Sequence, residues 1–436
     1  MKFPGQRKHK HFFPVEARDP RLSELLPDNK PVSGHVCGID QVLVDIEAHV
    51  EPEFLARHGL SRGHSLLLAP ERADAIYREL LEQGLIVSEF AGGTIGNTLH
   101  NYSVLADDRS VLFGVMSETI RVGTSAYRYL CTTSSRVDLN YLQPVAGSIG
   151  QCITLITPDG ERSFAINKGM MDRLSPDHLD REQIQSASAL VLTAYLMRCE
   201  AHEPMADSAR QAAEWARQAG VPVVLTMGTR FIVEDRRDWW QQFIRDHVTL
   251  VAMNEDEGLA LTGEADPLAA CDRVLEWADL VLCTAGPAGL YLAGHADEEQ
   301  LRETSRPLLP GRIPEFNRFE YSRPMRRADC RRPRRIYTHI SPYMGGPARI
   351  KNTNGAGDAA LAALLHDMAA NDYHRQNVPG SAKHRARHLT YSSLSQVSKY
   401  ANRVSFEVLV QHSPRLSRGL PEREDSLEEA YWAGEA

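Results

Sequence analysis

Short apolar runs alternate with amphipathic stretches in the second half of the chain, from about Leu174 onward. The apolar runs are Ala189–Thr193, Val221–Leu225, Thr249–Met253 and Asp279–Cys283. Their length suits buried strands, and the longer stretches between them have the spacing of helices. Strands that are apolar on both faces and separated by helices are typical of a parallel sheet covered on both sides. The pattern therefore predicts an α/β fold.

The first half of the chain mixes strands with helical segments. A strand is expected near Val36–Ile39. A hairpin is expected from Gly150–Thr157 and Arg162–Ile166, because the residues between them include the turn sequence Pro158-Asp159-Gly160. Residues 1–34 are predicted to form an N-terminal arm, and residues 35–436 to form one large domain.

Residues from about 295 to 349 interrupt this alternation. The stretch is rich in proline and arginine, and its arginines include Arg323, Arg326, Arg327, Arg331, Arg332, Arg334 and Arg335. A solvated insertion explains the composition best, because the chain around it is acidic. The alternatives are a contact with RNA or polyphosphate, a subunit contact and a cover over a bound nucleotide.

Composition narrows the class of protein. With 436 residues and 42% hydrophobic content, the chain can bury a large core. Its net charge of −8 argues against a general nucleic-acid binder. Seven widely spaced cysteines without a Cys-x-x-Cys pair indicate neither a disulfide framework nor a zinc site. No signal peptide or apolar membrane span is evident, so a soluble cytoplasmic protein is expected.

A loop of small residues precedes an alanine-rich stretch with apolar positions at helical spacing. The loop is Gly355-Ala356-Gly357, and Asp358 follows it. The free N–H groups and the positive dipole of a helix N-terminus suit a phosphoryl group. The same dipole is expected to keep Asp358 ionised, so that it acts as a base toward a hydroxyl group. The alternative is a plain glycine turn with Asp358 as a helix cap.

Three segments together resemble the ribokinase-like (PfkB) family of sugar and nucleoside kinases. They are Asn352–Asp358, Ala91–Asn97, which is similar to the family's Gly-Gly-x-x-x-Asn motif, and Asn254–Glu257, which is similar to its Asn-x-x-Glu element. They occur in the family's order, and similar segments run from about Val36 to Asn402. No Gly-Lys-Ser or Gly-Lys-Thr sequence is present, so a P-loop is excluded as the phosphate cradle.

The resemblance implies a ribokinase-like three-layer sandwich with a mostly parallel sheet. A small β lid would come from segments within about 40–60 and 110–170. The implied activity is ATP- and Mg²⁺-dependent phosphorylation of the 5′-hydroxyl of the purine nucleosides inosine and guanosine, a step of purine salvage. A free sugar or a sugar phosphate is the alternative acceptor. Neither a nucleic-acid nor a membrane partner is implied, and a homo-oligomer is left open.

The resemblance also assigns roles to individual residues on the acceptor side. Asp358 would be the base, and the amides of Gly355, Ala356 and Gly357 would form the anion hole. The nucleoside would be bound by Asp45, Gly92, Gly93 and Asn97, and Arg162 on the lid would reach the transferred phosphate. Asp40 competes with Asp45 for the sugar hydroxyls, but the spacing from Gly38 favours Asp45.

On the nucleotide side, the resemblance implies that ATP is bound by Thr284, Gly286, Gly289, Asn354 and Asn402. Asn254 and Glu257 would hold Mg²⁺ through water, and the same pair would form a helix capping box.

Two departures from the family pattern concern the nucleotide side as well. Asn352 stands where many members carry an Asp that helps to hold a monovalent cation, so potassium is doubtful. The family's Asp-x-Asn-x-Arg stretch corresponds to Thr226–Arg230 in this chain, where only Arg230 matches it.

Overall fold

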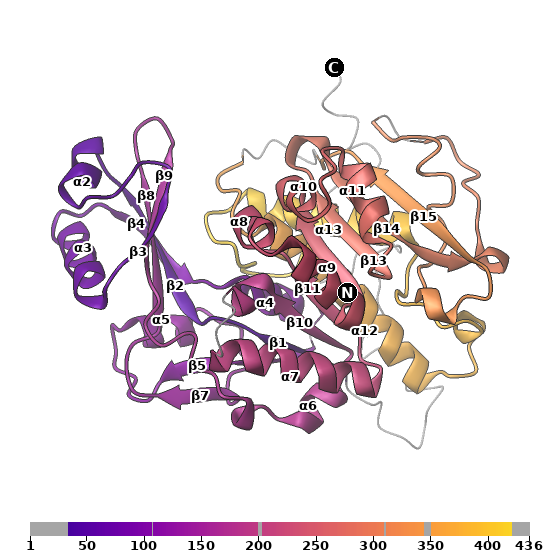
Figure 1. Cartoon of the computed structure of the whole chain (residues 1–436), viewed down its shortest axis with the longest axis horizontal. Coiled ribbons are helices and arrows are strands. Elements are labelled where there is room, and N and C mark those ends of the chain that lie inside the picture. Colours follow the sequence, from indigo (N-terminus) through magenta and orange to yellow (C-terminus); the bar gives the residue numbers. More distant parts are fainter. Residues whose placement is uncertain (1–33, 107, 199–202, 309–310, 344–349, 421–436) are drawn as a thin grey trace, which may run out of the picture.

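The computed structural model describes residues 34–106, 108–198, 203–308, 311–343 and 350–420. Two sheets with their helices make up this part of the chain (Figure 1). The larger sheet runs through the body of the molecule. The smaller sheet projects from it, and its strands are coloured indigo to purple. The predicted N-terminal arm lies outside the described residues, apart from Gly34.

The larger sheet is mostly parallel. Its strands follow the order β15-β14-β13-β12-β11-β10-β1-β5-β6, and β7 also pairs with β5. All neighbours pair in parallel except β14, which is antiparallel to both β13 and β15. The strands are β1 (His35–Ile39), β5 (Arg109–Ser117), β6 (Val137–Asp138), β7 (Leu142–Val145), β10 (Ala189–Thr193), β11 (Val223–Thr226), β12 (Leu250–Asn254), β13 (Leu280–Thr284), β14 (Leu290–Asp297) and β15 (Pro333–Ile340).

The four apolar runs of the sequence form the adjacent strands β10 to β13, which confirms the predicted α/β class. β10 has the predicted bounds, whereas β11 begins at Val223, after Pro222, which has no N–H group to donate. β12 and β13 are shifted by one residue, so that Asn254 and Thr284 are their last residues and lie directly opposite each other. The pairing brings two predicted site residues to one edge of the sheet.

Helices cover both faces of the larger sheet (Figure 1). α4, α12 and α13 pack together on one face, while α7, α9, α10 and α11 lie on the other. The helices are α2 (Pro52–Arg57), α3 (Pro70–Glu82), α4 (Thr94–Ala106), α5 (Ser125–Cys131), α6 (Arg181–Gln185), α7 (Pro204–Ala219), α8 (Arg230–Glu234), α9 (Arg237–His247), α10 (Glu255–Thr262), α11 (Pro267–Val274), α12 (Ala356–Asn377) and α13 (Leu394–Leu409).

Helix α12 is the central helix of its layer. It is buried on nearly all sides, because it packs against α4, α13 and the sheet. Its alanines allow these close approaches, since small side chains let neighbouring backbones come near. The predicted alanine-rich helix is thus confirmed, and it holds its N-terminus at a fixed place in the core.

The smaller sheet, called the lid sheet below, has the order β3-β9-β8-β2-β4. Its strands are β2 (Leu43–His49), β3 (Ser65–Leu67), β4 (Ile86–Ala91), β8 (Gly150–Ile156) and β9 (Arg162–Asn167). β2, β8 and β9 come from the segments predicted for a lid, and β8 and β9 form the predicted hairpin. β3 and β4 come from outside these segments, while β5 belongs to the larger sheet.

The segment predicted as an insertion contains the end of β14 and all of β15. Arginines beside β15 pair within the chain: Arg335 contacts Asp272 at 2.6 Å, and Arg334 contacts Glu298 at 3.4 Å. Arg323 is held between the carbonyl oxygen of Thr390 and the side chain of Asn371. These arginines contact acidic or carbonyl groups of the protein itself.

Within the described ranges, no helix combines the length and the apolar character that a membrane crossing requires.

The contact between β1 and α4 gives a test of the packing. A Cβ on Gly38 would lie 2.4 Å from Cγ2 of Ile95 and 3.0 Å from Cδ1 of Leu99. Gly38→Ala is therefore expected to lower the free energy of unfolding by about 1–3 kcal/mol in urea denaturation. The control is Gly380→Ala, because Gly380 is exposed and its Cβ would meet no atom within 4 Å. Equal stability of the two variants would contradict the packing described.

Candidate active site

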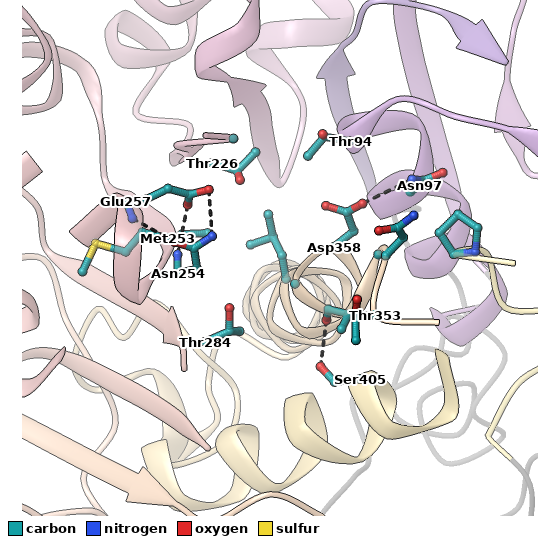
Figure 2. A pocket seen from close by; sticks show the side chains of 18 of the residues that line it. Thr94, Asn97, Thr226, Met253, Asn254, Glu257, Thr284, Thr353, Asp358 and Ser405 are labelled. Carbon is teal, nitrogen blue, oxygen red and sulfur yellow. Dashed lines mark hydrogen bonds between the residues drawn. The ribbon is translucent and has the colours of Figure 1, made fainter. Parts of the chain in front are cut away.

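A cavity of about 1230 Å³ lies between the lid sheet and the carboxyl ends of the parallel strands. Thr226, Asn254 and Thr284 reach it from the ends of β11, β12 and β13. Asp45 reaches it from β2 of the lid sheet, and the N-terminus of α12 opens into it. Ligands of parallel α/β sheets bind at this edge. Figure 2 shows the start of α12 between Asn97 on one side and the pair Asn254 and Glu257 on the other.

The predicted anion loop starts α12. Gly355 has φ +78°, and a Cβ there would lie 2.4 Å from Cβ of Pro414, so only glycine fits. A Cβ on Gly357 would meet no atom nearer than Oγ1 of Thr284 at 3.9 Å. Gly355, Ala356 and Gly357 all line the cavity. Free amides of the first helical turn therefore face space that an anion can enter.

Asp358 lies in the first turn of α12 and faces the same cavity (Figure 2). Its Oδ2 accepts a hydrogen bond from Nδ2 of Asn97 at 3.2 Å. Burial, opposed by the hydrogen bond from Asn97 and helped by the charges of Asp40, Asp45 and Glu257, raises the pKa of Asp358 to about 7. The expectation that the helix dipole keeps Asp358 ionised is therefore wrong. Desolvation and three carboxylates outweigh the dipole, and Asp358 carries a proton for part of the time at neutral pH.

The two glycines of the predicted acceptor motif let the carboxyl groups of two aspartates approach their backbone. A Cβ on Gly92 would lie 2.3 Å from Oδ2 of Asp45, and a Cβ on Gly93 would lie 2.3 Å from Oδ2 of Asp40. Gly93 also has φ +89°. Gly93, Asp45 and Asn97 line the cavity together, whereas the predicted residues Gly92 and Arg162 are not among its lining residues.

The competition between Asp40 and Asp45 is decided by their partners. Asp40 is buried, and its two oxygens accept from the backbone N–H groups of Gln41 at 2.9 Å and Gly96 at 2.7 Å. These bonds hold the start of α4. Asp40 and Asp45 both line the cavity, and burial raises the pKa of Asp45 to about 7 while Arg415 lowers it. Asp45 is thus the better candidate for two ligand hydroxyls.

Arg162 connects the lid sheet to the loop before α12. Its Nη1 donates to Oδ1 of Asn354 at 3.0 Å, and its Nη2 donates to Oδ1 of Asn352 at 3.4 Å. The amide nitrogen of Asn352 donates to Oε1 of Glu47 on β2 and to the carbonyl oxygen of His412. Asn352 therefore presents a donor toward Glu47, where an Asp would present acceptors. A donor at this position disfavours a potassium ion.

Asn254 and Glu257 form the expected capping box of α10 (Figure 2). Oδ1 of Asn254 accepts from the N–H of Glu257 at 2.8 Å, and Oε2 of Glu257 accepts from the N–H of Asn254 at 3.0 Å. Burial raises the pKa of Glu257 to about 7. In the part of the chain that the structure describes, no group of three His, Cys, Asp or Glu side chains could hold a metal ion directly. The pair suits a cation that keeps its water ligands, as Mg²⁺ does.

The predicted nucleotide residues line the other end of the cavity. Thr284, Gly286, Gly289, Asn354 and Asn402 are all among the lining residues. A Cβ on Gly289 would lie 2.1 Å from the carbonyl oxygen of Ile340, so this glycine serves the packing of the turn.

Two further residues predicted for the nucleotide side, Asn402 and Arg230, contact other parts of the protein. Asn402 donates to the carbonyl oxygen of Ser341 at 2.6 Å and accepts from the N–H of Tyr343, which holds that segment at the cavity wall. Arg230 pairs with Glu234 on the surface of α8 and is not one of the lining residues.

Arg415 was missed by the sequence reasoning. It lies after α13, is only 4% exposed, and contacts Asn97 and the carbonyl oxygen of Gly92. Its neighbours Ser413 and Leu416 form no recognisable motif, so no sequence signal distinguishes it from a solvated arginine.

Comparisons with known proteins agree with this geometry. The profile of the pfkB family of carbohydrate kinases matches residues 86–307. The guanosine-inosine kinase of Escherichia coli (strain K12) is 62% identical over 432 residues, which cover 99% of this chain and 100% of that protein. A solved adenosine kinase from Sinorhizobium meliloti has a TM-score of 0.62 at 21% identity, covering 92% of this chain and 100% of that one. A probable sugar kinase from Rhizobium etli has a TM-score of 0.63 at 19% identity, covering 92% and 98%. The two solved structures support the ribokinase-like fold alone.

The anion loop gives a prediction with a built-in control. Gly355→Ala should lower the free energy of unfolding by about 1–3 kcal/mol, because it combines a left-handed φ with a clash against Pro414. Gly357→Ala should leave stability within about 0.5 kcal/mol of the parent, since its Cβ has room. Urea denaturation of both variants measures the difference. A stable Gly355→Ala variant would contradict the loop conformation.

Proposed function

The chain belongs to the pfkB family of carbohydrate kinases, and we propose that it transfers the terminal phosphoryl group of ATP to the 5′-hydroxyl of guanosine and inosine. The observation that carries this proposal is the cavity itself. It places Asp358, the amides that start α12 and the acceptor residue Asp45 together, in a chain that is 62% identical along its length to guanosine-inosine kinase of Escherichia coli.

The size of the cavity supports two ligands at once. Its volume of about 1230 Å³ exceeds the roughly 300–1,000 Å³ of pockets that hold one small ligand. Asn97 lies on one side of the start of α12, while Asn254 and Thr284 lie on the other (Figure 2). A nucleoside on the first side and ATP on the second would meet at Asp358.

The acceptor side orients the ribose. We assign the two sugar hydroxyls to Asp45, whose carboxylate can accept from both, and we assign Asn97 to a neighbouring hydroxyl. Gly92 and Gly93 lack side chains that would fill this space. Such positioning holds the 5′-hydroxyl near Asp358, which removes much of the entropic barrier to reaction.

Asp358 accepts the proton of the 5′-hydroxyl as the bond to phosphorus forms. A free Asp, with a pKa of about 3.9, is a weak base toward an alcohol. Burial and neighbouring carboxylates raise the pKa of Asp358 to about 7, which makes it a stronger base near neutral pH. The proton moves to Asp358 while the oxygen bonds to the γ-phosphorus and the bridging oxygen leaves with ADP.

The amides of Gly355, Ala356 and Gly357 face the place where charge develops on the transferred group, and we assign them to its oxygens. Arg162 would add a positive charge from the lid, since it already reaches Asn354 beside the loop. Thr284, Gly286, Gly289 and Asn402 would border the nucleotide.

Asn254 and Glu257 fit a water-coordinated Mg²⁺. Their oxygens accept hydrogen bonds within the capping box and keep lone pairs for water. When bound, Mg²⁺ neutralises part of the charge on the phosphate oxygens.

We place this activity in the cytoplasm, where unpaired cysteines such as those described here persist.

A substrate panel tests the proposed function. With ATP and Mg²⁺, guanosine and inosine should yield 5′-monophosphates. Their kcat/KM should be at least about 100-fold above that of ribose or fructose 6-phosphate, because the purine ring adds binding energy. Adenosine completes the panel, and product is measured by chromatography. A preference for a free sugar or sugar phosphate would overturn the nucleoside assignment.

The pH profile tests the base. Because the pKa of Asp358 is raised to about 7, the ionised form is lost as the pH falls through that value. kcat/KM for guanosine should therefore fall about tenfold per pH unit below about pH 7.

Asp358→Asn should lower kcat by about 10²–10⁴-fold, because it removes the proposed base. The control, Asp372→Asn, changes a carboxylate of α12 that bonds Ser188 away from the cavity and should retain activity. Full activity of Asp358→Asn would disprove the assignment.

A further inference from the structure

We propose that Arg415 is a positioning residue of the phosphoryl-transfer site, which orients the amide of Asn97 so that this amide donates to Asp358. The inference rests on the proposed function and extends it to the segment after α13, outside every motif of the sequence.

The guanidinium of Arg415 is fixed by three donor bonds. Nε donates to Oδ1 of Asn97 at 2.9 Å, Nη1 to Oγ1 of Thr133 at 2.7 Å, and Nη2 to the carbonyl oxygen of Gly92 at 3.1 Å. Its central carbon lies 5.1 Å from the centroid of the Tyr129 ring. A planar fork with this many partners has one orientation, which a lysine could not reproduce.

The orientation of Arg415 determines that of the Asn97 amide. Because Oδ1 of Asn97 accepts from Arg415, its Nδ2 points the other way and donates to Oδ2 of Asp358 at 3.2 Å. A flipped amide would place its NH₂ against the guanidinium and its oxygen against the carboxylate. Both contacts would then be repulsive, since donor would meet donor and acceptor would meet acceptor. Arg415 and Asp358 thus select one amide orientation together.

The backbone around Arg415 is attached to the helix that carries Asn97. Asn101, one turn further along α4, donates to the carbonyl oxygen of Pro414 at 3.1 Å and accepts from the N–H of Leu416 at 2.7 Å. His100 of α4 bonds the carbonyl oxygen of Leu416 at 2.9 Å. One face of α4 therefore fixes the segment on both sides of Arg415.

The same segment also touches the anion loop, because Pro414 packs where a Cβ of Gly355 would be. Residues 414–416 thus join the acceptor helix α4 to the start of α12. The charge of Arg415 has a second effect on the acceptor side, since it lowers the pKa of Asp45 and of Asp40 against the burial that raises both. It favours the carboxylate form of Asp45 that accepts from hydroxyls.

A double-mutant cycle tests whether Arg415 acts through Asn97. kcat for guanosine is measured at saturating ATP and Mg²⁺ for Arg415→Met, Asn97→Leu and the double variant. Each single change should lower kcat by about 10- to 100-fold, and the double variant should be no slower than Asn97→Leu alone. Arg415→Lys, which keeps the charge without the fork, should recover less than about half of the loss on a logarithmic scale.

A second variant covers the case in which Arg415→Met does not fold. In its carboxylate form, Asn97→Asp keeps an acceptor for Arg415 but cannot donate to Asp358, so above about pH 8 it should lower kcat as much as Asn97→Leu does. The matched control is Arg323→Met, which removes an arginine that bonds Thr390 and Asn371 near the far end of α12. It should leave kcat within about twofold and combine additively with Asn97→Leu.

Additive effects of Arg415→Met and Asn97→Leu, or full activity of Asn97→Asp, would overturn the inference while the proposed function stands. A wild-type protein that phosphorylates no nucleoside would overturn both.

Discussion

The positive end of α12 opens into a cavity that also receives the carboxyl groups of Asp40, Asp45, Glu257 and Asp358. Burial raises the pKa of each to about 7. Such a concentration of acids persists because donors surround it: the capping amides of α4 and α10, the guanidinium of Arg415 and the amide of Asn97. The same balance of charge suits a base beside a bound phosphate.

Two further sets of contacts connect the loop before α12 to the lid sheet and to the segment after α13. Arg162 and Glu47 of the lid sheet bond Asn354 and Asn352 in the loop before α12. Pro414 fills the space beside Gly355 from the other side. The anion loop is thus held by the lid, by the C-terminal segment and by its own helix. The lid sheet and the loop before α12 are therefore in direct hydrogen-bond contact.

Local chemistry explains how much the sequence predicted. β10 to β13, the start of α12 and the capping box at Asn254 depend on neighbouring residues, and the sequence located all of them within a few residues. The protonation of Asp358 depends first on its burial and then on carboxyl groups that the fold brings from β2 and α10, so the dipole argument alone was wrong. Arg415 gained its role only through tertiary contacts with α4. β15 was not predicted, because its segment is rich in arginine and was interpreted as a solvated insertion.

The most direct measurement is a crystal structure with guanosine and a non-hydrolysable ATP analogue bound with Mg²⁺. The account predicts the ribose hydroxyls on Asp45, the 5′-oxygen within hydrogen-bond distance of Asp358 and the terminal phosphate over the amides of residues 355–357. The Asn97 amide should keep its oxygen toward Arg415. A nucleoside whose 5′-oxygen lies away from Asp358, or a terminal phosphate bound elsewhere in the cavity, would contradict the account.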